Sequence, residues 1–149
     1  MTNILKAVIT TLFFTFVLAG CASSYQYASK DPSLQITDER IKALSERDLA
    51  YWEYFSKNDF DATYKYELPH LQYLKSLAWY KNFYASANKN FTMQQSKITL
   101  VNSDRAIIKH HFRDKEGNSL ELEDRWVLVK DTWFHYFDLT KLPLNTPPF

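Results

Sequence analysis

The hydrophobic pattern of this chain changes its period near residue 90, and this change constrains the fold more than any other feature. Over residues 37–87 the apolar side chains recur three or four positions apart, whereas over residues 97–138 they alternate with polar ones. Spacing of the first kind is typical of helices and spacing of the second kind of half-buried strands. The sequence therefore predicts an α+β domain in which N-terminal helices pack on one face of a curved antiparallel sheet.

A first helix is expected to begin near Thr37, which suits an N-cap, and to end at Asn58-Asp59. Asp48 interrupts the apolar face of this helix, and a carboxylate in such a place either has a partner or lines a cavity. Two further helices are predicted over residues 60–66 and 71–87. The apolar face of the first helix consists of Ile41, Leu44, Tyr51, Trp52 and Phe55.

Four strands are predicted after the helices, joined by short turns. Gly117 lies in the loop of one hairpin, where a glycine accommodates a positive φ, and Lys130-Asp131 forms the next tight turn. The predicted strands cover residues 97–101, 105–113, 120–130 and 132–138. The tail that follows is rich in proline, which cannot continue a central strand.

Several polar residues share strand faces with large apolar ones, which suggests a polar cluster in an aromatic cavity. The candidate pocket residues are Asp48, Tyr51, His110, Asp124, Trp126 and His135. One interpretation is purely structural, with Asp48 paired to Arg125 or to a tyrosine hydroxyl. A second is a pocket for a small apolar ligand. A third is proton transfer by a carboxyl group whose pKa burial raises.

No catalytic residue, cofactor or metal is assigned from the sequence. His110 and His111 are neighbours on a predicted strand, so their side chains point to opposite faces and do not chelate one ion together. Gly20 and Gly117 are the two glycines, which argues against a glycine-rich phosphate loop. The formal net charge is +1, so nothing predicts a basic surface for nucleic acid.

The first 21 residues resemble the export signal of bacterial lipoproteins. Lys6 precedes an apolar run over residues 7–17, and Leu18-Ala19-Gly20-Cys21 resembles a lipobox that contains the single cysteine of the chain. The resemblance implies cleavage after residue 20, lipid on Cys21, and anchoring in a membrane. No Asp follows Cys21, which in enterobacterial sorting favours the outer membrane, with the domain facing the periplasm.

The region after the lipobox resembles the nuclear transport factor 2-like (cystatin-related) cone, and in particular uncharacterised bacterial proteins of that superfamily. The residues that carry the resemblance are Arg47, Tyr51-Trp52, Asn58-Asp59-Phe60, Tyr64, Pro69, Ala106 and Arg125 to Trp133. It implies a cone whose sheet curls around the helices. It implies no single activity, because the superfamily contains both enzymes and binding domains.

Together these observations predict a signal peptide over residues 1–20, a lipidated tether over 21–36, a cone domain over 37–140 and a proline-rich tail over 141–149. The predicted function is that of a membrane-anchored periplasmic lipoprotein, a non-enzymatic module for protein binding or envelope assembly. The alternative is a carrier of a small apolar ligand, or a proton-transfer enzyme, that uses the cone cavity. Expected partners are the membrane, through Cys21, an envelope protein, and a second copy of the chain on the outer face of the sheet.

Overall fold

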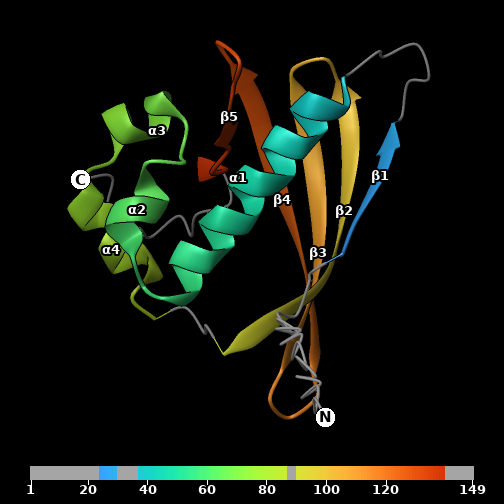
Figure 1. Cartoon of the computed structure of the whole chain (residues 1–149). Helices are drawn as coiled ribbons and strands as arrows, with labels where there is room; N and C mark the ends of the chain where they lie inside the picture. Colours follow the sequence, from blue (N-terminus) through green and yellow to red (C-terminus); the bar gives the residue numbers. More distant parts are fainter. Residues whose placement is uncertain (1–23, 30–36, 87–89, 140–149) are drawn as a thin grey trace, which may run out of the picture.

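Helices cover one face of a five-stranded sheet in the computed structural model of the chain (Figure 1). The structure describes residues 24–29, 37–86 and 90–139. This is the α+β class predicted from the change of period. The predicted signal peptide, Cys21 and the tail over 141–149 lie outside the described residues. In the part of the chain that is described, no helix is both long and apolar enough to cross a membrane.

The long helix α1 (Asp38–Ser56) runs across the sheet and confirms the first predicted helix. Its N-cap, Thr37, has an extended backbone but makes no side-chain capping hydrogen bond. The helix stops before Asn58, which adopts a positive φ of 61°. This left-handed conformation is one that asparagine tolerates better than most residues, and it turns the chain toward the next helix.

Three short helices follow: α2 (Phe60–Tyr64), α3 (Pro69–Leu74) and α4 (Leu77–Tyr84). The single helix predicted over 71–87 is wrong, because the chain is extended at Lys75. The Tyr64 hydroxyl lies 2.5 Å from the carbonyl oxygen of Lys75 and 3.0 Å from that of Gln72, so its one proton is shared between two carbonyls at the end of α3. Ser76 then caps α4 by accepting from the Trp79 amide at 3.2 Å.

The sheet is open, with its strands in the order β1-β2-β3-β4-β5. Four strands form the predicted antiparallel meander, and they are β2 (Phe91–Asn102), β3 (Arg105–Asp114), β4 (Ser119–Val129) and β5 (Thr132–His135). Gly117 has a φ of 91° in the first predicted turn, and Lys130 and Asp131 have positive φ values of 48° and 60° in the second. Two consecutive positive values are the pattern of a tight hairpin turn.

The structure differs from the sequence prediction at the start of the described chain. Strand β1 (Ser24–Ser29) lies within the segment predicted to be a tether, and it pairs in parallel with β2. Tyr25 and Tyr27 alternate with polar residues, which is a strand pattern, but the run is too short to be recognised from its sequence. Pairing with the edge of β2 and a contact from Tyr25 to α1 hold it in place.

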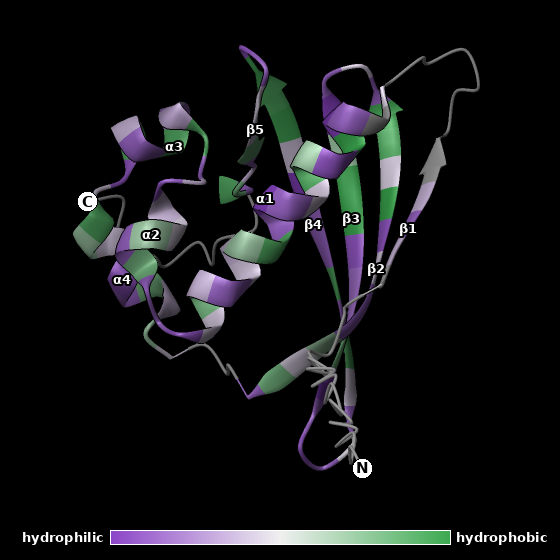
Figure 2. Ribbon diagram, in the orientation of Figure 1, coloured by the Kyte–Doolittle hydropathy of each residue, from purple (hydrophilic) through white to green (hydrophobic). Residues whose placement is uncertain are grey.

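The core lies between the helices and the inner face of the sheet. One buried cluster joins α1 to the strands and contains Leu44, Tyr51, Ile98, Leu100, Ala106, Ile108, Trp126 and Trp133. A second joins the short helices to the end of α1 and contains Phe55, Phe60, Leu71 and Tyr80. Hydrophobic and hydrophilic residues are mixed along α1 and the strands (Figure 2), as expected for elements with one buried face.

Candidate functional site

Five ionisable side chains meet in the interior between α1 and the sheet, and we call them the acid–base cluster. They are Asp48 on α1, Glu67 in the loop between α2 and α3, His110 on β3, Asp124 on β4 and His135 on β5. Asp48, Glu67 and His110 have no exposed surface, whereas the side chain of Asp124 is 14% exposed. Buried charges are tolerated only where they are paired.

His110 connects the two aspartates. Its Nε2 lies 3.3 Å from Asp48 Oδ1 and 3.2 Å from Asp124 Oδ2. Its Nδ1 lies 2.8 Å from the hydroxyl of Ser96, which in turn lies 3.1 Å from the sulfur of Met93. Both ring nitrogens of His110 therefore have partners that accept hydrogen bonds, which is the arrangement that an imidazolium requires.

Aromatic side chains donate further hydrogen bonds to the two aspartates. Asp48 accepts from the Tyr25 hydroxyl at 2.8 Å and from Trp126 Nε1 at 3.1 Å. Trp52 Nε1 lies 2.9 Å from Asp124 and 3.2 Å from His110 Nε2. An indole nitrogen only donates, so Trp52 donates to Asp124 when His110 Nε2 carries a proton.

His135 forms the second half of the acid–base cluster. Its Nδ1 lies 2.9 Å from Glu67 Oε2, and its Nε2 lies 3.5 Å from Asp124 Oδ1. Glu67 also accepts from the hydroxyl of Tyr80 at 2.8 Å and from that of Tyr51 at 3.3 Å. The ring of Tyr51 stacks on His135 with 4.5 Å between the centroids.

The acid–base cluster raises the pKa values of both of its histidines. Burial alone would lower the pKa of His110, but the hydrogen bonds and charges of Asp124 and Asp48 outweigh it and raise the pKa to about 9. Burial opposes the charge of His135 too, and Glu67 and Asp124 raise its pKa to about 10. At neutral pH both imidazoles are therefore protonated.

The pKa values of the two aspartates shift in opposite directions. Burial raises the pKa of Asp48, and the hydrogen bond from His110 only partly opposes this effect. Burial would also raise the pKa of Asp124, but hydrogen bonds from His110 and His135 lower it well below its usual range. Asp124 is therefore the anion that faces both imidazolium ions, and the charge of Glu67 also acts on His135.

The acid–base cluster contains potential metal-ligand atoms that lie close together, but these groups already take part in hydrogen bonds. One atom from each of Asp48, His110 and Asp124 lies within 4.8 Å of the others. A ligating histidine must be neutral, however, and here Trp52, Trp126 and Tyr25 already donate to the carboxylates. We therefore assign no metal to these residues.

The structure brings all six predicted pocket residues into one contiguous group. Asp48, His110, Asp124 and His135 belong to the acid–base cluster, while Trp126 donates to Asp48 and Tyr51 stacks on His135. Of the partners considered for Asp48, the structure shows a tyrosine hydroxyl. Arg125 is directed elsewhere, with Nη1 3.5 Å from Asp138 Oδ2.

Sequence reasoning missed three residues of this group: Tyr25, Trp52 and Glu67. Trp52 was assigned only to the apolar face of the helix, although an indole N–H on that face is itself a signal that an acceptor lies nearby. Glu67 lies in a loop where no periodicity applies. As predicted, His111 points away from His110, and its Nδ1 lies 3.1 Å from Glu121 Oε1.

Comparisons with known proteins do not assign the chain to a family. No family model matches it, and no curated protein matches it. Among solved structures, a SEC-C motif containing protein from Psychrobacter arcticus is similar over 62% of this chain and 58% of its own, with 13% identity and a TM-score of 0.41. The matched region thus spans less than two thirds of that protein.

Proposed function

We propose that this protein is a lipid-anchored lipoprotein of the bacterial envelope whose nuclear transport factor 2-like domain is a non-enzymatic protein-binding or envelope-assembly module. The lipobox at Leu18-Ala19-Gly20-Cys21 supports the anchor. A diacylglyceryl group and an N-acyl chain together give stable membrane attachment, since one chain alone binds only marginally. The proposed location is the periplasmic face of the outer membrane.

The arrangement of the described elements supports the proposed fold family. In a cone of this kind the helices pack into the concave face of a curved sheet. Here α1 crosses the inner face, Trp126 of β4 donates to its Asp48, and Trp133 of β5 donates to the carbonyl of Arg40 at 3.1 Å. These contacts hold the helix against the sheet at two points along its length.

A single observation supports the non-enzymatic part of the proposal: the buried polar atoms of the acid–base cluster all have hydrogen-bond partners within the protein. Among the described residues, Arg47 Nε is the only buried side-chain nitrogen or oxygen without a hydrogen-bond partner. Arg47 lies outside the acid–base cluster, with its guanidinium over the rings of Tyr66 and Phe134. A general base needs a lone pair directed at substrate, and the carboxylates at the centre of the fold direct theirs at Tyr25, Trp52, Trp126 and the two histidines.

One observation favours the alternative, an enzyme or ligand carrier that uses the cone interior. Asp124 is the most exposed carboxylate of the acid–base cluster, so a ligand would meet it first. The substitution Asp124→Leu separates the two proposals. Removing one partner of a buried ion pair lowers stability under either proposal, so the deciding result is ligand retention measured by native mass spectrometry. If the folded variant retains the same small ligand as the native protein, or if neither retains one, the use of Asp124 by a ligand or substrate is refuted.

Metabolic labelling tests the anchor. Cells that express the full chain or its Cys21→Ser variant are given an alkyne fatty acid, and the protein is isolated from membrane and soluble fractions. We expect label and membrane association only with Cys21 present. Labelling of both chains, or of neither, would refute lipidation at this residue. An Ala22→Ser variant serves as the matched control, because it changes the next residue and leaves the thiol in place.

Photo-crosslinking in intact cells tests the binding module. Tyr73 on α3 is 87% exposed, the largest value among the exposed hydrophobic side chains that the structure describes, so it is a suitable position for a photoreactive residue. A probe at the exposed Lys115 in the hairpin loop is the control. We expect one discrete adduct from position 73 that Asp124→Asn preserves and Cys21→Ser abolishes. An adduct that disappears with Asp124→Asn in a folded protein would implicate the interior instead.

A further inference from the structure

A groove of about 460 Å³ lies on the outer face of the sheet, the face turned away from α1, and we call it the outer groove. Its floor and walls are mostly apolar, and two arginines, Arg105 and Arg125, reach its edge. The most exposed apolar residues there are Val101, at 39%, and Tyr136, at 40%, while Leu68, Ile107 and Val127 are half-buried. The volume falls within the range of small-molecule sites, which is about 300–1,000 Å³.

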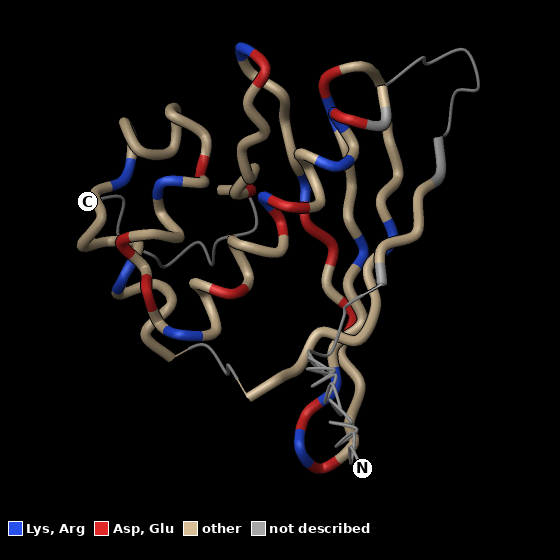
Figure 3. The backbone as a smooth tube through the Cα atoms, in the orientation of Figure 1, with Lys and Arg blue, Asp and Glu red and all other residues tan. Residues whose placement is uncertain are grey.

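Two cross-strand pairs of opposite charge lie on the outer face beside the outer groove. Along the ladder between β3 and β4, Lys109 lies opposite Glu123 with a salt bridge of 4.0 Å, and His111 lies opposite Glu121 at 3.1 Å. Figure 3 shows these neighbouring strands, with acidic residues along β4. Cross-strand pairs of opposite charge stabilise a sheet, so these four side chains compensate one another.

At the next two positions of the ladder, no residues of opposite charge face each other. Ile107 lies opposite Arg125, and Arg105 lies opposite Val127, so each arginine faces an aliphatic side chain. The two arginines are diagonal neighbours on one face, a separation of about 7–8 Å between Cα atoms. Arg125 has the 3.5 Å contact to Asp138, whereas Arg105 forms no salt bridge with any residue that the structure describes.

We propose that the outer groove binds an amphipathic anion, an apolar ring or chain that carries a carboxylate. The carboxylate lies between Arg105 and Arg125, and the apolar body covers Ile107, Val127 and Tyr136. Arginine is suited to this task, because its planar fork of donors matches the two oxygens of a carboxylate. The proposal is independent of lipidation and of the acid–base cluster, from which the sheet separates this face.

The test uses the full chain in detergent micelles with 13C-labelled isoleucine and valine methyl groups. It is titrated with 3-phenylpropionate, and in parallel with the neutral 3-phenylpropanol, to separate the effect of charge from that of the apolar body. We expect the carboxylate to shift the methyl signals of Ile107 and Val127 with saturation. The alcohol is expected to bind at least about tenfold more weakly, the loss typical of a charge-assisted hydrogen bond.

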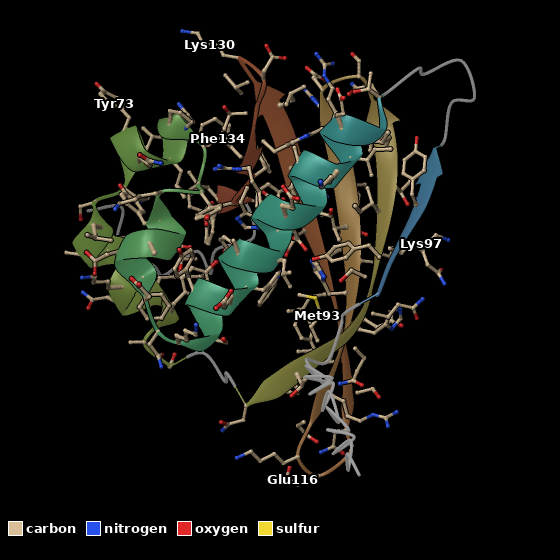
Figure 4. The ribbon with its side chains drawn as sticks, viewed as in Figure 1. Tyr73, Met93, Lys97, Glu116, Lys130 and Phe134 are labelled. Atoms are coloured by element: carbon tan, nitrogen blue, oxygen red, sulfur yellow. The ribbon has the colours of Figure 1, made fainter. Side chains whose placement is uncertain are left out.

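Three variants make the test specific. Arg105→Gln and Arg125→Gln are each expected to weaken binding of 3-phenylpropionate about tenfold or more. Lys97→Gln is the matched control, because it removes one positive charge from an exposed residue of β2 outside the outer groove (Figure 4). Binding that is unchanged in this control and weakened in both arginine variants supports the proposal.

Four outcomes would overturn it. These are no saturable shift, equal affinity for acid and alcohol, equal weakening by Lys97→Gln and the arginine variants, and shifts confined to the interior around Trp52. The third would mean diffuse attraction to a charged face, and the fourth would place the ligand inside the cone. Because both arginines are exposed, their substitution is expected to leave the fold intact, and an unchanged melting temperature verifies this.

Discussion

Replacing Glu67 with glutamine removes one charge from the acid–base cluster and leaves its shape in place. In the native protein Glu67 faces His135 at 2.9 Å and is completely buried. The pKa of His135 rises from 6.5 to about 10, and Glu67 and Asp124 share the cause. At about 1.4 kcal/mol for each pH unit, the whole rise corresponds to roughly 5 kcal/mol. Because burial opposes this rise, the two carboxylates together contribute at least this much, and an equal share for Glu67 gives an expected loss of at least about 2–3 kcal/mol.

The general cost of breaking a buried ion pair is similar to this expected loss of stability. Removing one partner of a buried ion pair costs about 3–5 kcal/mol, because the other charge is left buried and unpaired. Glutamine retains an acceptor oxygen for Tyr80, and His135 retains Asp124, so the lower end of that range applies. For a domain of this size, about 3 kcal/mol lowers the melting temperature by roughly 6–15 °C.

The assay is denaturant unfolding of both proteins at pH 6 and pH 9.5. The raised pKa of His135 stabilises the fold fully below 6.5, and this contribution is lost as the pH rises toward about 10. The difference between native protein and Glu67→Gln is therefore expected to be largest at pH 6 and clearly smaller at pH 9.5. The reasoning is refuted if the difference is below 1 kcal/mol at pH 6 or is the same at both values. A Glu53→Gln variant on the exposed face of α1 is the control, and it is expected to change stability by less than about 0.5 kcal/mol.

Two further predictions concern the native protein and β1. The free energy of unfolding is expected to fall as the pH rises from 6.5 through about 9, because His110 loses its proton over this range. It is also expected to fall as the pH drops below about 3.8, because Asp124 is then protonated in the unfolded chain. A pH series of urea titrations measures both changes, and a flat profile between pH 6 and 9 contradicts the first. Tyr25→Phe removes the 2.8 Å hydrogen bond to Asp48, and we expect a loss of about 1–2 kcal/mol together with faster amide exchange in β1, whereas Tyr27→Phe, which alters an exposed ring on the same strand, is expected to change neither.

Much of the architecture follows from local pattern. The stripe on α1 and the alternation around Ile108, His110 and Phe112 are repeated over enough residues to define which face is buried. Turn chemistry defines the hairpins, because Gly117 and the Lys130-Asp131 pair occupy positions of positive φ. These are properties of short segments, and short segments are what a sequence displays directly.

Elements held by distant partners could not be predicted in this way. The break between α3 and α4 depends on the Tyr64 hydroxyl, which satisfies the carbonyl of Lys75 from outside the helix. Strand β1 exists because the edge of β2 accepts it and because Tyr25 reaches Asp48, 23 positions along the chain. Neither cause leaves a periodic signal in the segment that it shapes.

The sequence by itself determined that acids, histidines and aromatic residues share the interior, since Asp48, His110, Asp124 and His135 all lie on apolar faces. Only the tertiary structure decided what they do there. In the folded protein His110 lies between the two aspartates, and Glu67 reaches His135 from a loop. Trp52 and Trp126 donate to the carboxylates of the aspartates. The physical reason is that the ionisation of a buried group depends on the few ångströms around it, and residues far apart in the chain occupy that space.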